Sequence, residues 1–222
     1  PGVPYEMREM MESFILPDLV RRSGETAVIR SRTLRTWGDS ESGLAEKLGD
    51  RIDQFESIGN PTLAFLASGI EGIKVRITAK SATEEAASEI LAAEEQFLRN
   101  LLGDIVFGID EETMETVVLE RMRRQGMTLA VAETLTGGVM ASRLSDIDRQ
   151  LEVFRGATIT AGHDQGTGPE RAIAAARKAQ ADYSTDVGIA VVEAIASDGQ
   201  RRGTVYLGIV MGNTEFTELV AL

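Results

Sequence analysis

Cysteine is absent from the sequence of 222 residues, and histidine occurs once, as His163. The lack of cysteine excludes disulfide bonds, a thiolate nucleophile and cysteine-ligated metal ions. A single histidine likewise excludes metal sites that need several of them. Because disulfides belong to oxidising compartments, a cysteine-free sequence is typical of a cytoplasmic protein. We therefore expect a cytoplasmic protein with neither a bound metal ion nor a cofactor.

Long apolar runs and positive charge are also scarce. No stretch approaches the roughly 18 consecutive apolar residues that a membrane-spanning helix needs, so no membrane insertion is expected. The opening residues, PGVPYEMREMM, lack the basic and apolar regions of a signal peptide, and because position 1 is not methionine we expect a fragment boundary there. The net charge of −12 opposes non-specific attraction to nucleic-acid phosphates.

The first half of the chain has the pattern of a small α+β unit. Residues 5–22 show helical spacing of apolar residues, which Pro17 interrupts. The segments that follow are predicted as strand, helix, strand, strand and helix, at 26–38, 40–56, 61–69, 72–80 and 82–102. Ser40 is the predicted N-cap of the first of these helices, and a tight turn at 69–72 joins the second and third strands.

The second half alternates strands and helices. Helices are predicted at 110–126, which ends at Gly126, at 136–147 and, rich in alanine, at 169–181. Strands are predicted at 127–133, 153–160, 186–195, 203–212 and 215–222, with a glycine-rich loop at 162–168. This alternation is typical of an α/β sheet domain with helices packed on the sheet.

One motif in this half, AVAETLTGGVMASRL at 130–144, suggests a ligand site. A helix that begins near Thr136 leaves its first N–H groups unpaired, and its N-terminus carries a partial positive charge. Gly137 and Gly138 allow close approach, and Thr134 and Thr136 add hydroxyl groups. A phosphate, a carboxylate or a developing oxyanion would suit such a site. The alternative interpretation is an N-cap with tight packing and no ligand.

The segment ETLTGGVMASRLSDI resembles the ESCTGG signature of the CinA family of competence/damage-inducible proteins. PGVPYEMREMMESFILPDL resembles the end of that family's N-terminal molybdopterin-binding-like domain, RTLRTWGDSESGLAEKLGD and GIKVRITAK resemble its KH-like central domain, and GTVYLGI resembles a strand of its C-terminal domain. The resemblance implies an N-terminal remnant at 1–23, a KH-like α+β domain at 24–108 and a CinA C-terminal α/β domain at 109–222. That last domain in the family is a nicotinamide mononucleotide (NMN) amidohydrolase, and the family's N-terminal domain is linked to ADP-ribose pyrophosphatase activity.

The resemblance also implies which residues to examine. The family's nucleophilic serine is replaced here by Thr134, and its assisting tyrosine and lysine align with Ala161 and Gly166, whose side chains cannot exchange a proton. A threonine nucleophile still needs a base. We therefore predict a degenerate amidohydrolase domain that acts as a binding, scaffold or regulatory module, with Thr136, Gly137 and Gly138 contacting a nicotinamide nucleotide or another small anion. The alternative is an active, divergent enzyme that uses Thr134 as nucleophile, with His163 as its base.

Three further features of the sequence concern nucleic-acid binding, metal binding and assembly. The GIEG sequence at 69–72 matches the G-x-x-G of nucleic-acid-binding KH domains, but it joins two predicted strands rather than two helices, and residues 24–108 carry a net charge of −5 from nine cationic and 14 acidic residues. A nucleic-acid partner is therefore not expected.

The acidic clusters at 84–85, 94–95 and 110–112 lie at predicted helix starts and solvent faces, which explains them without a bound metal ion. CinA-like proteins are thought to assemble, and a sheet without a closing helix leaves a surface to cover, so we expect a homo-oligomer.

Overall fold

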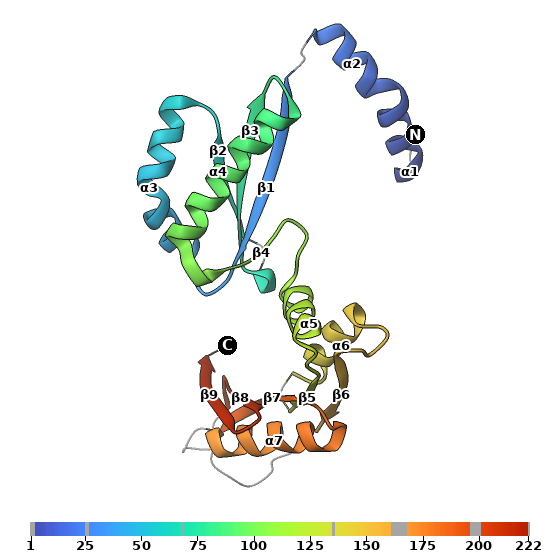
Figure 1. Ribbon diagram of the computed structural model, residues 1–222, viewed down its shortest axis with the longest axis vertical. Coiled ribbons are helices and arrows are strands. Elements are labelled where there is room, and N and C mark those ends of the chain that lie inside the picture. Colours follow the sequence, from blue (N-terminus) through green and yellow to red (C-terminus); the bar gives the residue numbers. More distant parts are fainter. Residues whose placement is uncertain are drawn as a thin grey trace. The chain divides into compact units, whose positions relative to one another are not determined.

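The computed structural model describes residues 3–24, 27–67, 69–134, 136–160, 168–195 and 201–221. The chain divides into two compact units, Pro1–Glu112 and Thr113–Leu222, each built around its own sheet (Figure 1). The first is an α+β unit with an antiparallel sheet, and the second is an α/β unit with a mixed sheet. This is the predicted fold class.

The first unit begins with an exposed helical segment. Helix α1 (Pro4–Met10) continues through a π-helical turn (Met11–Ile15) into α2 (Leu16–Ser23), which ends at Gly24 with φ of 64°. The π-helical turn ends two residues before Pro17, the predicted interruption, whose ring and missing N–H disturb regular α-helical hydrogen bonding. None of the residues in these three elements is buried.

The sheet of the first unit has the strand order β2-β3-β1-β4, with every neighbouring pair antiparallel. Its strands are β1 (Val28–Thr36), β2 (Thr62–Ala67), β3 (Ile73–Ser81) and β4 (Val106–Ile109), and its helices are α3 (Glu41–Ile58) and α4 (Glu84–Leu102). A 3-10 turn at Gly69–Glu71 joins β2 to β3, as the glycine pair indicated. The sequence did not predict β4, which is four residues long.

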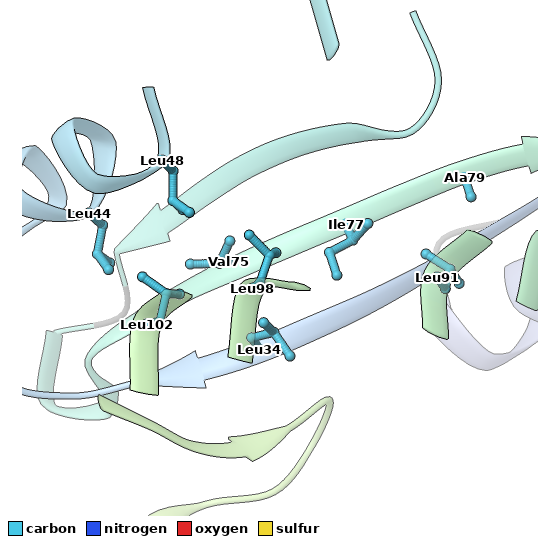
Figure 2. Packing of buried hydrophobic residues seen from close by; sticks show 9 residues of the cluster. All are labelled: Leu34, Leu44, Leu48, Val75, Ile77, Ala79, Leu91, Leu98 and Leu102. Atoms are coloured by element: carbon cyan, nitrogen blue, oxygen red, sulfur yellow. The ribbon is translucent and has the colours of Figure 1, made fainter. Parts of the chain in front are cut away.

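Helices α3 and α4 pack on one face of this sheet and form the core. Leu98 and Leu102 of α4 lie over Leu34 of β1 and Val75 of β3, and Leu44 of α3 joins them (Figure 2). Side chains alternate between the two faces of a strand. The neighbours of Leu34 and Val75 along their strands, such as Thr33 and Arg76, therefore point to the opposite face of the sheet.

The second unit contains α5 (Met114–Gln125), α6 (Val139–Ile147) and α7 (Gly168–Tyr183). Its strands are β5 (Leu129–Glu133), β6 (Phe154–Ile159), β7 (Val187–Ile195), β8 (Arg201–Met211) and β9 (Thr214–Ala221), in the order β6-β5-β7-β8-β9. Strands β6, β5 and β7 are parallel, whereas β8 and β9 are antiparallel to their neighbours. The carboxyl ends of the three parallel strands therefore share one edge of the sheet.

Helices cover both faces of this second sheet (Figure 1). On one face, the buried alanines of α7 pack against Ala130 and Ala190. These small side chains let the helix approach closely: a Cβ on Gly208 of β8 would lie 2.5 Å from the carbonyl oxygen of Ala172. On the other face, α5 and α6 pack over Leu129 and Val131 through a separate cluster that contains Leu119 and Leu144.

Candidate functional site

A hollow of about 260 Å³ lies where the parallel strands end beneath α7. Ligand pockets typically have volumes of about 300–1,000 Å³, so this one suits a small ligand. Its apolar wall contains Ala132 and Val192, and its polar wall contains the hydroxyl groups of three threonines and two cationic side chains of α7: Thr134, Thr158, Thr160, Arg171 and Lys178. Open α/β sheets bind ligands at the carboxyl ends of their strands, so this hollow is the candidate site.

Thr134 stands at the end of β5, with its side chain in this hollow. Its hydroxyl oxygen accepts a hydrogen bond from the backbone N–H of Glu193 at 3.1 Å and lies 3.4 Å from the carbonyl oxygen of Val191, to which it donates. The Thr134 N–H also donates to that carbonyl, at 3.0 Å. The residue thus extends the pairing of β5 with β7. Its one hydroxyl proton is directed at a carbonyl oxygen, which is not a base.

The turn after Thr134 is organised by Glu133, which is fully buried. Its carboxylate accepts hydrogen bonds from the backbone N–H groups of Gly138 at 3.2 Å, Met140 at 3.1 Å and Ala141 at 2.8 Å, and from the hydroxyl of Thr136. The first N–H groups of α6 therefore point at the chain's own carboxylate. Glu133 supplies the negative charge that a helix N-terminus favours.

The helix begins later than the sequence predicted. Its first residue is Val139 rather than a residue near Thr136, because Gly137 and Gly138 have φ values of 61° and 97°. Such left-handed conformations cannot belong to a right-handed helix and favour glycine. The two glycines form the turn that carries the chain from β5 around to α6.

The predicted ligand-binding residues therefore differ in what they contact. Successive side chains of a strand point to opposite faces, so Glu133 lies on the α5 and α6 side while Thr134 lies beneath α7. The Thr136 hydroxyl and the Gly138 N–H are bonded to Glu133. Gly137 is exposed, and its N–H has no partner among the described residues. His163, together with Ala161 and Gly166, lies outside the described residues.

Two cationic residues of α7 line the hollow although the sequence did not single them out. Arg171 and Lys178 are seven residues apart, which is two helical turns, so both project from the same face of α7. Lys178 also pairs with Asp182 at 2.7 Å. Lys178 is 70% exposed, so it lies at the open rim of the hollow, whereas Arg171 is half-buried.

Asp148 connects α6 to β6 and fixes the start of the strand that carries Thr158. Its carboxylate accepts from the N–H groups of Val153 at 2.7 Å and Phe154 at 2.8 Å, and Arg123 lies 3.3 Å away. Burial opposes ionisation of this carboxyl, but the backbone hydrogen bonds and Arg123 outweigh it and hold the pKa of Asp148 below its usual range.

Two family models match this chain. Residues 31–108 match the family described as Damage-inducible protein CinA KH domain, and residues 111–164 match the CinA C-terminal domain. The chain belongs to the CinA family.

Relatives with curated names agree with this membership. A CinA-like protein of Frankia casuarinae is 44% identical over 160 residues, covering 72% of this chain and 37% of that protein. A competence-damage inducible relative in Moorella thermoacetica is 33% identical over 229 residues, covering 94% of this chain and 54% of the relative. The chain therefore spans about a third to a half of these CinA relatives. A crystal structure of a CinA superfamily protein from Escherichia coli aligns with a TM-score of 0.45 and 20% identity, over 49% of this chain and 74% of that one.

Within the described ranges, no helix combines the length and apolarity needed to cross a membrane. The same residues contain no group of three or more histidine or carboxylate side chains placed to hold a metal ion.

Proposed function

We propose that this CinA-type chain acts as a binding or regulatory module whose second unit holds a small anionic ligand, such as a nicotinamide nucleotide, without efficient hydrolysis. One observation carries the proposal. The hydroxyl of Thr134, at the family's nucleophile position, is engaged with the backbone of β7, and no described side chain that could act as a base hydrogen-bonds to it.

The size of the expected effect follows from this arrangement. A positioned general base contributes about 10²–10⁴-fold to an enzyme's rate. Without it, the pocket and its hydrogen-bond donors retain binding and a residual acceleration of about 10³–10⁴-fold over the uncatalysed reaction. Residual turnover would thus be orders of magnitude below that of an enzyme with an activated nucleophile.

The lining of the hollow supports a ligand with negative charge. Arg171 and Lys178 bring two cations to one wall, and charge-assisted hydrogen bonds are worth about 1.5–3 kcal/mol each. The hydroxyl groups of Thr158 and Thr160 add donors for phosphate or ribose oxygens. In this proposal, the ligand is held from α7 and the strand ends, and Gly137 adds a backbone N–H.

The second candidate function is a divergent amidohydrolase that uses Thr134 as its nucleophile. It is favoured by the position of the Thr134 side chain in the hollow. An attacking hydroxyl would have to leave the carbonyl of Val191 and transfer its proton to a base, a role for which His163 is the candidate.

Ammonia release from NMN separates the two functions. We expect the wild-type chain to release no more ammonia than Thr134→Val, which removes the hydroxyl and keeps the side-chain shape. We also expect calorimetry to detect NMN binding that weakens about tenfold, or 1.4 kcal/mol, in Lys178→Met. Arg149→Met, which removes an exposed cation outside the hollow, is the matched control. Turnover that Thr134→Val abolishes establishes the enzyme instead, and a chain that neither binds nor hydrolyses NMN overturns the proposal.

A further inference from the structure

Among the described residues, the helices that pack on the sheet of the first unit, α3 and α4, lie on one face, and the other face carries cationic side chains. Leu34, Val75 and Ile77 point toward α3 and α4. The alternation of side chains along a strand therefore places Lys74, Arg76 and Lys80 on the opposite face. Arg35 points the same way, but it is buried, with 3% of its side chain exposed, and contributes no accessible cation. Arg35 lies across from Lys74, and Thr33 lies across from Arg76. We name this surface the open sheet face.

Most of these cations follow one central strand. Lys74, Arg76 and Lys80 all belong to β3, so they span about 20 Å along the strand at about 3.3 Å per residue. Glu71 neutralises part of one end, because its carboxylate pairs with both Arg35 at 2.9 Å and Lys74 at 3.1 Å. Arg76, in contrast, is exposed and forms no ion pair with any described residue. Arg76 thus leaves positive charge in the middle of the open sheet face, on a chain whose total is −12.

The complementary charge lies on the opposite side of the same unit. Helix α3 turns Leu44, Leu48 and Phe55 toward the core. Its exposed side carries four acidic residues at helical spacing: Glu46, Asp50, Asp53 and Glu56. Like charges three or four residues apart destabilise a helix. None of the four makes an ion pair with a described residue, so a cationic partner would relieve their repulsion. We name these four residues the acidic ridge of α3.

We propose that the open sheet face docks the acidic ridge of α3 of a second copy of this chain. The two surfaces are complementary in charge and comparable in length, since the ridge from Glu46 to Glu56 spans about 15 Å at 1.5 Å per residue. They lie on opposite sides of one unit, so the contact is head-to-tail: each copy offers its ridge to one neighbour and its sheet face to another. Such heterologous contacts build rings or chains rather than two-fold dimers.

A foreign polyanion fits the open sheet face less well. Bases of single-stranded nucleic acids stack on aromatic side chains, and the residues that β1 and β3 place on this face are aliphatic, hydroxylic or cationic. Exposed ion pairs are individually weak and are screened by salt. The association is therefore weak and salt-dependent, and it gains its selectivity from charge arrangement.

Sedimentation velocity on the full chain tests the proposal. At about 0.1 M salt the Debye length is about 10 Å, which screens the overall repulsion between copies but leaves close contacts active; at about 1 M it is about 3 Å. We expect the wild-type chain to associate at the lower salt concentration and to dissociate at the higher one. At the lower salt concentration, Arg76→Glu, or Asp50→Lys with Asp53→Lys, should weaken the self-association at least tenfold. Arg149→Glu, and the double variant Asp146→Lys with Glu218→Lys, change exposed charges elsewhere by the same amounts and serve as controls for net charge.

A mixing experiment makes the test specific to the head-to-tail contact. Neutral replacements are used for mixing, so that the two altered surfaces do not attract each other: Arg76→Gln keeps its acidic ridge, and the Asp50→Asn, Asp53→Asn variant keeps its open sheet face. Mixing the two is expected to restore one contact and yield a 1:1 complex that does not grow. A wild-type chain that stays monomeric at 0.1 M salt overturns the proposal, as does a mixture that forms no complex. A monomer that binds labelled polyglutamate or an oligonucleotide would assign the open sheet face to a foreign polyanion instead.

Discussion

Replacing Glu133 with glutamine tests whether this carboxylate holds the turn between β5 and α6 together. Glu133 is fully buried. One of its carboxylate oxygens accepts from Thr136, Gly138 and Met140, and the other accepts from Ala141. A glutamine can keep its amide oxygen where it accepts from Thr136, Gly138 and Met140. Its NH₂ group then faces the N–H of Ala141, so that two donors point at each other.

The magnitude follows from two losses. An unsatisfied buried donor costs about 1–3 kcal/mol, and removing the negative charge from a helix N-terminus costs about 0.3–2 kcal/mol. We therefore expect Glu133→Gln to destabilise the second unit by about 2–4 kcal/mol. That is a large share of the 5–15 kcal/mol that stabilises a typical domain, so the variant should fold but open more often.

Hydrogen exchange read by mass spectrometry suits a chain with two units, because a single unfolding midpoint would mix them. Peptides from β5, α6 and β6 should exchange faster in Glu133→Gln, while peptides from the first unit report no change. Glu218→Gln, which alters an exposed glutamate of the same unit, is the matched control. A loss of less than about 0.5 kcal/mol, the range of ordinary surface substitutions, would refute the organising role of Glu133.

Two further predictions concern buried charges in each unit. Arg51→Met should destabilise the first unit by about 3–5 kcal/mol, as removal of one member of a buried ion pair does. The guanidinium that it removes lies 3.1 Å from both Glu94 oxygens and 4.4 Å from the centre of the Phe97 ring. Urea unfolding followed by the fluorescence of Trp37 measures the loss, and adding Glu94→Leu should recover most of it. The folded protein holds the pKa of Asp148 below its unfolded value. Its contribution to the stability of the second unit is therefore full above about pH 5 and is lost as the pH falls through the folded pKa. Asp148→Asn should make the free energy of unfolding of the second unit less dependent on pH in acid, and an unchanged dependence would contradict this role of Asp148.

Local signals in the sequence were sufficient for most elements of the fold. The caps are clear examples: Ser40 accepts from the N–H of Gly43 at the start of α3, and Gly126 ends α5 in a left-handed conformation. Both positions follow from side-chain hydrogen bonding and from the conformational freedom of glycine. Strand β4 was missed because four residues carry too little periodic signal, and its pairing with β1 is a tertiary contact.

The candidate site was harder to predict because its parts meet only through packing. Thr134 was identified from the motif, but the sequence did not indicate that its hydroxyl bonds to β7, which lies more than fifty residues away. Arg171 and Lys178 gave a helical spacing with no sign of which way that face points. The start of α6 is predicted too early for a different reason. The motif gives no sign that Gly137 and Gly138 adopt left-handed conformations, or that Glu133 accepts from the first N–H groups of α6.

If the donors of the turn are arranged for a carboxylate, they should accept one that is not covalently attached. Glu133→Ala removes a CH₂–COO⁻ group, which is the size of acetate, and leaves the donors of Gly138, Met140 and Ala141 without their acceptor. Acetate at ten times its dissociation constant would stabilise the folded variant by about 1.4 kcal/mol. Added acetate should therefore slow hydrogen exchange of α6 in Glu133→Ala, whereas chloride at equal ionic strength, and acetate added to the wild type, should not. Equal effects of the two salts would mean that the donors adapt to the loss of Glu133 and form no anion site. A specific effect of acetate would show that the helix N-terminus is an anion site in its chemistry and that in the intact chain its occupant is Glu133.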